Sequence, residues 1–200
     1  VGQYQKAYQH MNDAFRKVIL DKIASEHPAF ILHVGDVVFQ GSSDSHWEEF
    51  DNNARAIREQ GIPVFPVLGN HEYFGDNTSA LANYFRHFPA TENRQWYSFR
   101  FESVGYILLN SNFDELTADD ISRQDEWYAR ELASFQADST LSTIVVACHQ
   151  PPYTNSTVVD DDLGVQEHFV PRFDRSAKAK LFVSGHCHSY EHFIRAGKHF

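Results

Sequence analysis

Four short apolar runs, each followed at once by glycine or polar residues, constrain this chain more than any other feature of its sequence. The runs lie at 30–34, 64–68, 144–147 and 181–184. Continuous apolar runs of this length, bounded by glycine, are typical of strands that are buried on both faces of a sheet. In sheets covered by helices, the residues that bind ligands usually lie at the ends of the strands. We therefore expect the four runs to bring the residues that follow them to one edge of a sheet.

The residues that leave these runs are potential metal ligands. Carboxylate oxygen, amide oxygen and imidazole nitrogen together satisfy a divalent cation. The candidates are Asp36, Asn70, His149 and His186, with His188 two residues further on. If 186–188 is extended, His186 and His188 point the same way and could hold two metals, while Cys187 faces away. Taken singly, Asp36 and Asn70 could shape turns, and His149 could be a hydrogen-bonded core histidine. Their shared position at strand exits favours a metal site.

The intervening segments predict an α/β fold. Apolar residues at helical spacing predict helices over 11–23, 45–57, 78–88, 121–135 and 165–173. Ser45 and Glu48 have the spacing of a capping box, and the helix at 121 could be capped by Thr117 or Ser122. The segments 96–101 and 106–109 predict a hairpin with its turn at 102–105. Helices between strands, together with a hairpin, predict one domain over 1–200, with mixed or doubled β-sheets flanked by helices.

Composition narrows the classes of partner. The formal net charge of −10 disfavours binding to a nucleic-acid polymer, whereas small phosphate esters stay possible because bound cations reverse the local charge. The two cysteines, Cys148 and Cys187, lie beside candidate ligands and do not suggest a disulfide scaffold. No run is long enough to span a membrane, and no signal peptide or initiating Met is found, so we expect a trimmed chain. Oligomeric state and compartment stay open.

The ordered motifs resemble the calcineurin-like metallophosphoesterases over nearly the whole chain. They are Gly35-Asp36, Gly69-Asn70-His71-Glu72, the strand-end His149, and Gly185-His186-Cys187-His188. Within that superfamily, the segment Gly185-His186-Cys187-His188-Ser189-Tyr190-Glu191 and the segment Trp96-Tyr97-Ser98-Phe99 are most similar to the purple acid phosphatase branch. The resemblance implies a layered metallophosphoesterase sandwich and hydrolysis of phosphate esters, with small phosphomonoesters as the expected substrates.

The resemblance also implies roles for the candidate residues. Asp36 would bridge two metal ions (Fe, Zn or Mn), with Asn70, His149 and His186 completing one site and His188 belonging to the other. His71 would lie near the scissile bond, where it stabilises charge or protonates the leaving oxygen, so Asp36 and His71 are the expected catalytic residues. A purely structural partnership of His71 with Glu72 or Asp36 is the alternative. The metals would activate water for direct in-line attack.

Two departures from the family pattern limit these expectations. The family's first Asp motif would precede residue 1 and has no substitute in 1–8, and the chain stops at Phe200, so we expect truncation at both ends. Phe39 stands where purple acid phosphatases place the tyrosine that ligates ferric iron, so a purple Fe(III)–Tyr centre is not expected. Two alternatives follow: a phosphodiesterase or nucleotide hydrolase on the same centre, and a truncated, non-catalytic metal-binding module.

Overall fold

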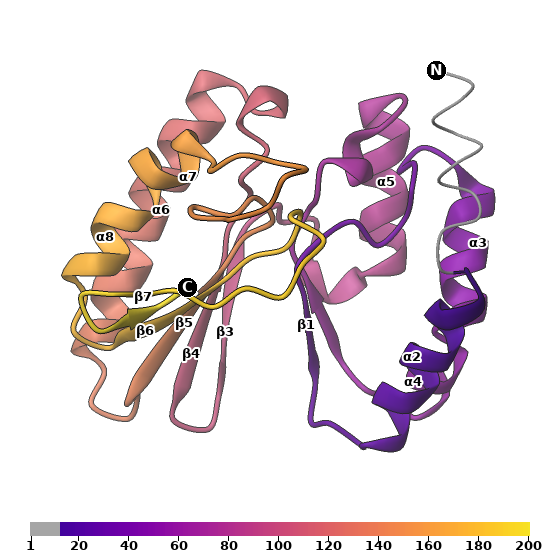
Figure 1. The fold of residues 1–200 in the computed structure, drawn as a ribbon, viewed down its shortest axis with the longest axis horizontal. Coiled ribbons are helices and arrows are strands. Elements are labelled where there is room, and N and C mark those ends of the chain that lie inside the picture. Colours follow the sequence, from indigo (N-terminus) through magenta and orange to yellow (C-terminus); the bar gives the residue numbers. More distant parts are fainter. Residues whose placement is uncertain (1–12) are drawn as a thin grey trace.

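The computed structural model describes residues 13–200, which are arranged as helices, sheet, sheet and helices (Figure 1). The helices are α2 (Asp13–Ser25), α3 (Asp44–Asn53), α4 (Arg55–Glu59), α5 (Asn77–His87), α6 (Ala118–Ala137), α7 (Leu163–His168) and α8 (Val170–Arg175). The strands are β1 (Ile31–His33), β2 (Val64–Pro66), β3 (Tyr97–Phe101), β4 (Val104–Leu108), β5 (Thr143–Ala147), β6 (Ala179–Val183), β7 (Ile194–Arg195) and β8 (Lys198–His199). A short 3₁₀ helix, η1 (His71–Tyr73), follows β2.

The strands divide between two sheets flanked by helices, which confirms the expected α/β sandwich with mixed sheets, but the four apolar runs do not share one sheet as expected. β1 and β2 form a parallel pair, whereas the second sheet has the order β3-β4-β5-β6-β8-β7. Its central strands β4, β5 and β6 are parallel, and antiparallel hairpins form both edges. In Figure 1, α2 to α5 lie on the side of β1, and α6 to α8 lie beyond the second sheet. Because helices cover only the outer faces, the inner faces pack on each other.

Three apolar clusters hold these layers together. One lies between α6 to α8 and the large sheet and includes Tyr128, Phe135 and Phe173. A second, around Trp47 and Tyr84, joins α3 and α5 to the end of β2. The third lies between the sheets: Val67, Tyr97, Leu108 and Ala147 are buried there, with Leu32, Val34, Phe65 and Phe99 packed against them. This last cluster brings the exits of β1 and β2 next to those of β5 and β6.

Several element boundaries differ from the sequence prediction for local reasons. The helix at 45–57 starts earlier, at Asp44 with Ser43 as N-cap, so the predicted capping box at Ser45 is wrong. The helix predicted over 165–173 is divided into α7 and α8, because Pro171 supplies no backbone N–H near the start of α8. Thr117 and Asp120 form a full capping box on α6, which confirms Thr117 over Ser122.

Helix α2 matches the helix predicted over 11–23, although Met11 and the segment 1–8 lie outside the described residues. Three of its large apolar side chains are exposed: Phe15 is 63% exposed, and Val18 and Ile19 are more than half exposed, whereas Ala24 is buried. The narrow pair of β1 and β2 leaves this part of the helix uncovered by the described residues. Within residues 13–200, no helix combines the length and apolar character needed to cross a lipid bilayer.

Candidate metal centre

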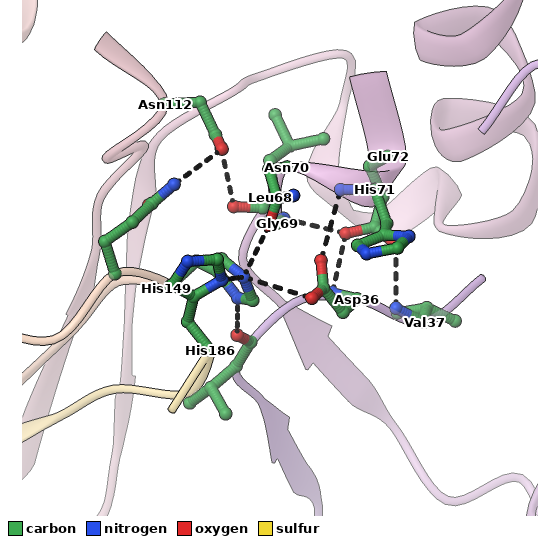
Figure 2. Close-up of polar contacts among 12 residues, drawn as sticks. Asp36, Val37, Leu68, Gly69, Asn70, His71, Glu72, Asn112, His149 and His186 are labelled. Atoms are coloured by element: carbon green, nitrogen blue, oxygen red, sulfur yellow. Dashed lines mark hydrogen bonds and ion pairs between the residues drawn. The ribbon is translucent and has the colours of Figure 1, made fainter. Parts of the chain in front are cut away.

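The exits of four strands meet around the ring of His149 (Figure 2). Its Nε2 atom lies 3.2 Å from Asp36 Oδ2, 3.1 Å from Asn70 Oδ1 and 3.0 Å from His186 Nδ1. These side chains come from β1, β2, β5 and β6, which lie in two sheets. His149 is 1% exposed, so the atoms meet away from bulk water. Four of the five predicted ligands are therefore neighbours in space.

The hydrogen bond of the other ring nitrogen of His149, Nδ1, determines the protonation of Nε2 in the neutral ring. Nδ1 lies 2.6 Å from the backbone oxygen of Val34, and a carbonyl oxygen only accepts, so Nδ1 carries a proton and donates. In the neutral ring, Nε2 then presents a lone pair to the oxygens of Asp36 and Asn70 and to the His186 nitrogen. In that form, electron-pair donors converge on one point, which is favourable when a cation lies among them, either a metal ion or, in its absence, a proton on Nε2. The residues present thus fit a metal ion.

Without a metal ion, His149 and Asp36 shift each other's pKa values. Burial by itself lowers the pKa of His149, but the hydrogen bond and charge of Asp36 outweigh burial and raise it above its ordinary value. Burial raises the pKa of the Asp36 carboxyl, whereas contacts with His149 and then His71 lower it, and the net direction is down. In His186, burial and the neighbouring His149 lower the pKa. Asp36 is thus held ionised beside a histidine pair.

The backbone before Asp36 lets the side chains approach closely. Gly35 has a φ of +90°, and Asp36 itself lies in the left-handed region at +57°. A Cβ on Gly35 would lie 2.5 Å from His149 Nδ1 and 2.8 Å from the backbone of Gly69. Glycine is therefore required by both conformation and space at the β1 exit.

His71 borders the centre on the side of η1. Its backbone N–H donates to Asp36 Oδ1 at 3.2 Å, and its Nδ1 donates to the backbone oxygen of Phe39 at 2.7 Å. The rings of Phe39 and Phe74 pack on the imidazole at centroid distances of 5.1 and 4.4 Å. Phe39 thus contributes a backbone acceptor and an apolar wall at the position where the resemblance would place a tyrosine.

His188 is not brought into the group that Asp36, His149 and His186 form. Its side chain is exposed, and both His186 and His188 have left-handed backbone, with φ of +65° and +56°. The segment is a tight bend instead of an extended stretch, in which Cys187 N–H donates to Gly185 O at 2.7 Å. The expectation that alternate residues there point the same way is therefore wrong, because that rule holds only for extended backbone.

Sequence reasoning missed a polar segment behind His149. The Ser111 hydroxyl accepts hydrogen bonds from the backbone N–H groups of His149 and Gln150, each at 3.1 Å. Asn112 donates from its amide to Leu68 O at 2.9 Å and accepts from the Gln150 amide at 3.0 Å (Figure 2). The segment 110–112 directly follows the apolar run that ends in β4. The signal that identified the other four strand exits could therefore have found this one.

A cavity of about 430 Å³ opens beside Asn70. Ser111, Asn112 and Gln150 are among its polar lining residues. Four carboxylates line its walls without a basic residue among the lining groups: Asp114, Glu115, Asp161 and Asp162. A volume of this size accommodates a small molecule.

Comparison with known proteins places this geometry in a family. The family model of the calcineurin-like phosphoesterases matches residues 2–190. A search of curated proteins gave no match. Among solved structures, a dimetal phosphatase from Danio rerio is similar with a TM-score of 0.70 and 13% identity, over 95% of this chain and 76% of that one.

Two further structures share the fold. GAP50, described as the anchor in the inner membrane complex of Plasmodium, gives a TM-score of 0.71 at 17% identity, over 92% of this chain and 64% of that one. Purple acid phosphatase PPD1 from yellow lupin (Lupinus luteus) seeds gives 0.64 at 16% identity, over 87% of this chain and 33% of that one. This chain thus spans less than two thirds of both proteins. Because the family model covers all four strand-exit motifs, the chain belongs to the calcineurin-like phosphoesterases, a family of metal-dependent hydrolases of phosphate esters.

Proposed function

We propose that this chain hydrolyses small phosphomonoesters at a centre of two metal ions. One ion would be held by Asn70, His149 and His186 together with Asp36, and Asp36 would share the second ion with His188. The observation that carries the proposal is that three electron-pair donors converge on His149 Nε2. The ring carries a proton on its other nitrogen, Nδ1, which donates it to the backbone oxygen of Val34. When bound, the ions, whether Fe, Zn or Mn, supply Lewis-acid chemistry that neutralises phosphate charge and activates water.

Asp36 and His71 would supply negative charge and proton transfer, respectively. Asp36 is kept ionised by His149 and His71 and so supplies fixed negative charge to the ions. His71 donates from Nδ1 to Phe39 O, so only the imidazolium form, which carries a second proton on Nε2, can give a proton to the leaving oxygen and still keep this bond. The contact of its backbone N–H with Asp36 holds this imidazole next to the centre. Phe39 offers no side-chain oxygen, which supports a centre without tyrosinate.

The cavity beside Asn70 supports a small substrate. Its volume of about 430 Å³ suits the alcohol part of a simple phosphate ester. Its acidic walls repel an anionic polymer, since a nucleic-acid backbone would bring further negative charge to them. A monoester carries its two charges on the phosphoryl group, which the metal ions would neutralise.

Replacing His149 or Asn70 with Ala tests the proposal. We expect metal-dependent hydrolysis of a mono-aryl phosphate to fall by more than about 100-fold, since loss of even the outer partners of metal ligands costs about 10- to 100-fold. His168→Asn is the matched control, because His168 lies on α7 and pairs with Asp125 instead. Unchanged turnover in either Ala variant contradicts the proposal. Faster hydrolysis of a bis-aryl phosphate would assign the centre to phosphodiesters.

A non-catalytic metal-binding module is the second candidate. It is favoured by the exposed position of His188, which leaves the second ion with few ligands among the described residues. Elemental analysis after loading with Mn or Zn and desalting separates the candidates. Two ions per chain with turnover support the enzyme, and one ion without turnover supports the module.

A further inference from the structure

Glu72 is a buried carboxylate that no step of the proposed reaction uses. Its side chain is fully buried, with an exposed fraction of 0%. Each of its oxygens accepts two backbone hydrogen bonds. Oε1 accepts from Val37 N at 2.7 Å and Val38 N at 3.3 Å. Oε2 accepts from Asp36 N at 2.8 Å and Gly69 N at 2.7 Å. Asp36, Val37 and Gly69 are labelled around Glu72 in Figure 2. One carboxylate thus ties the β1 exit to the β2 exit.

The donors are the backbone groups that set the candidate ligands in place. One is the N–H of Asp36 itself, and another belongs to Gly69, the residue before Asn70. Asp36 has a left-handed backbone, which a residue with a β-carbon adopts only when its surroundings impose it. The bonds to residues 36–38 are the surroundings that hold it there. Without them, the hydrogen bond from the His71 backbone N–H to Asp36 Oδ1 would remain, but the backbone of 36–38 would lose its ties to the β2 exit.

Space around Gly69 shows how closely these groups fit. A Cβ on Gly69 would lie 2.3 Å from Asp36 Oδ1, 2.5 Å from Asp36 N and 2.9 Å from Glu72 Oε2. Gly69 does not have a positive φ, so its backbone conformation would allow a side chain. A side chain is excluded there only by the lack of space. The two strand exits therefore meet at one point, where Glu72 joins them.

We infer that Glu72 is a positioning residue, which holds the exits of β1 and β2 at the separation that lets Asp36 and Asn70 bind the same metal ion. This inference deepens the proposed function and rests on it for the metal centre. Glu72 acts through the backbone and touches no substrate. Its substitution should weaken metal binding and slow turnover while the recognition of the ester is retained.

Glu72→Gln is the sharpest perturbation, because it keeps size and shape. Either orientation of the amide places its NH₂ group against two backbone N–H donors, so two of the four bonds are lost. Gln136→Ala is the control for a general loss of stability. Gln136 also accepts two hydrogen bonds, from Ser176 Oγ at 2.8 Å and Lys178 N at 3.0 Å, but these lie at the opposite end of β6.

Binding of Mn²⁺ is measured by titration of the metal-free variants, under conditions where circular dichroism shows each to be folded. We expect the Kd of Glu72→Gln to rise about 10- to 100-fold and that of Gln136→Ala to stay within about two-fold of wild type. At saturating Mn²⁺, kcat for a mono-aryl phosphate should fall in Glu72→Gln with KM nearly unchanged. If Glu72→Gln does not fold, Gly69→Ala tests the same junction and should raise the Kd in the same direction.

The outcomes separate this inference from the proposed function. A folded Glu72→Gln or Gly69→Ala variant with the wild-type Kd overturns the positioning role, as does an equal rise in Gln136→Ala. A wild-type chain that binds Mn²⁺ tightly but hydrolyses no phosphate ester overturns the proposed function alone, since the Kd comparison still decides the role of Glu72. A wild-type chain that binds no Mn²⁺ overturns both.

Discussion

His33, on β1, provides a test of how the fold tolerates charge near the candidate metal centre. Its Nδ1 atom is buried and has no hydrogen-bond partner among the described residues. Burial lowers the pKa of His33 from 6.5 to about 4, with Asp36 opposing this effect and His149 adding to it. His33 is therefore neutral in the folded protein at neutral pH, and protonation must overcome its burial.

The sign and size of the effect on stability follow from these two values. Between pH 6.5 and about 4, the unfolded chain binds a proton at His33 that the folded chain does not, so the free energy of unfolding decreases as the pH falls. The gap between 6.5 and about 4, at about 1.4 kcal/mol for each pH unit, corresponds to about 3 kcal/mol. This contribution is fully present above pH 6.5 and is lost on the way to pH 4.

Urea unfolding of the metal-free protein at pH 7 and pH 4 measures this contribution in wild type and in His33→Leu. Other groups titrate in both proteins, so the quantity of interest is the difference between the two pH-dependent losses. We expect the wild type to lose about 3 kcal/mol more than His33→Leu. His27→Gln, which alters an exposed histidine, should retain the wild-type loss. Equal losses in wild type and His33→Leu would refute the reasoning.

Two predictions concern the stability of the scaffold around the centre. Thr117→Ala removes the capping box that joins Thr117 and Asp120 at the start of α6, and should lower the free energy of urea unfolding by about 1 kcal/mol; an unchanged midpoint would contradict this role. Gly105→Ala places a Cβ 2.3 Å from the Phe135 ring, and should cost about 1–3 kcal/mol, visible as a lower Tm, unless Phe135 moves freely.

Local sequence patterns predicted most elements because each depends on near neighbours. Buried strands such as β5 are recognisable in the sequence as apolar runs. The cap at Thr117 depends only on residues within one helical turn. Doubled β-sheets were expected, but the assignment of each strand to one of the two sheets could not be predicted in this way. It depends on which faces the helices leave open, a property of residues far apart in the sequence.

The candidate site shows the same limit at the level of single residues. Asp36, Asn70, His149 and His186 were predictable because each follows an apolar run within one or two residues. The position of His188 outside this group could not be predicted. It follows from left-handed backbone at His186 and His188, and no local sequence signal indicates this conformation at two non-glycine residues. Glu72 was visible in its motif, but three of its four backbone partners, at 36–38, are 34 to 36 residues away in the sequence, and only the fold brings them to Glu72.

The left-handed backbone at Asp36, His186 and His188 has a consequence for how this chain could change over time. Each of these residues carries a β-carbon in a conformation that disfavours it by roughly 1 kcal/mol or more. Glycine or asparagine at these positions would relieve that cost and make the protein more stable. Stability alone therefore does not account for aspartate and histidine at these three positions, and the proposed metal centre would give the conformational cost a use.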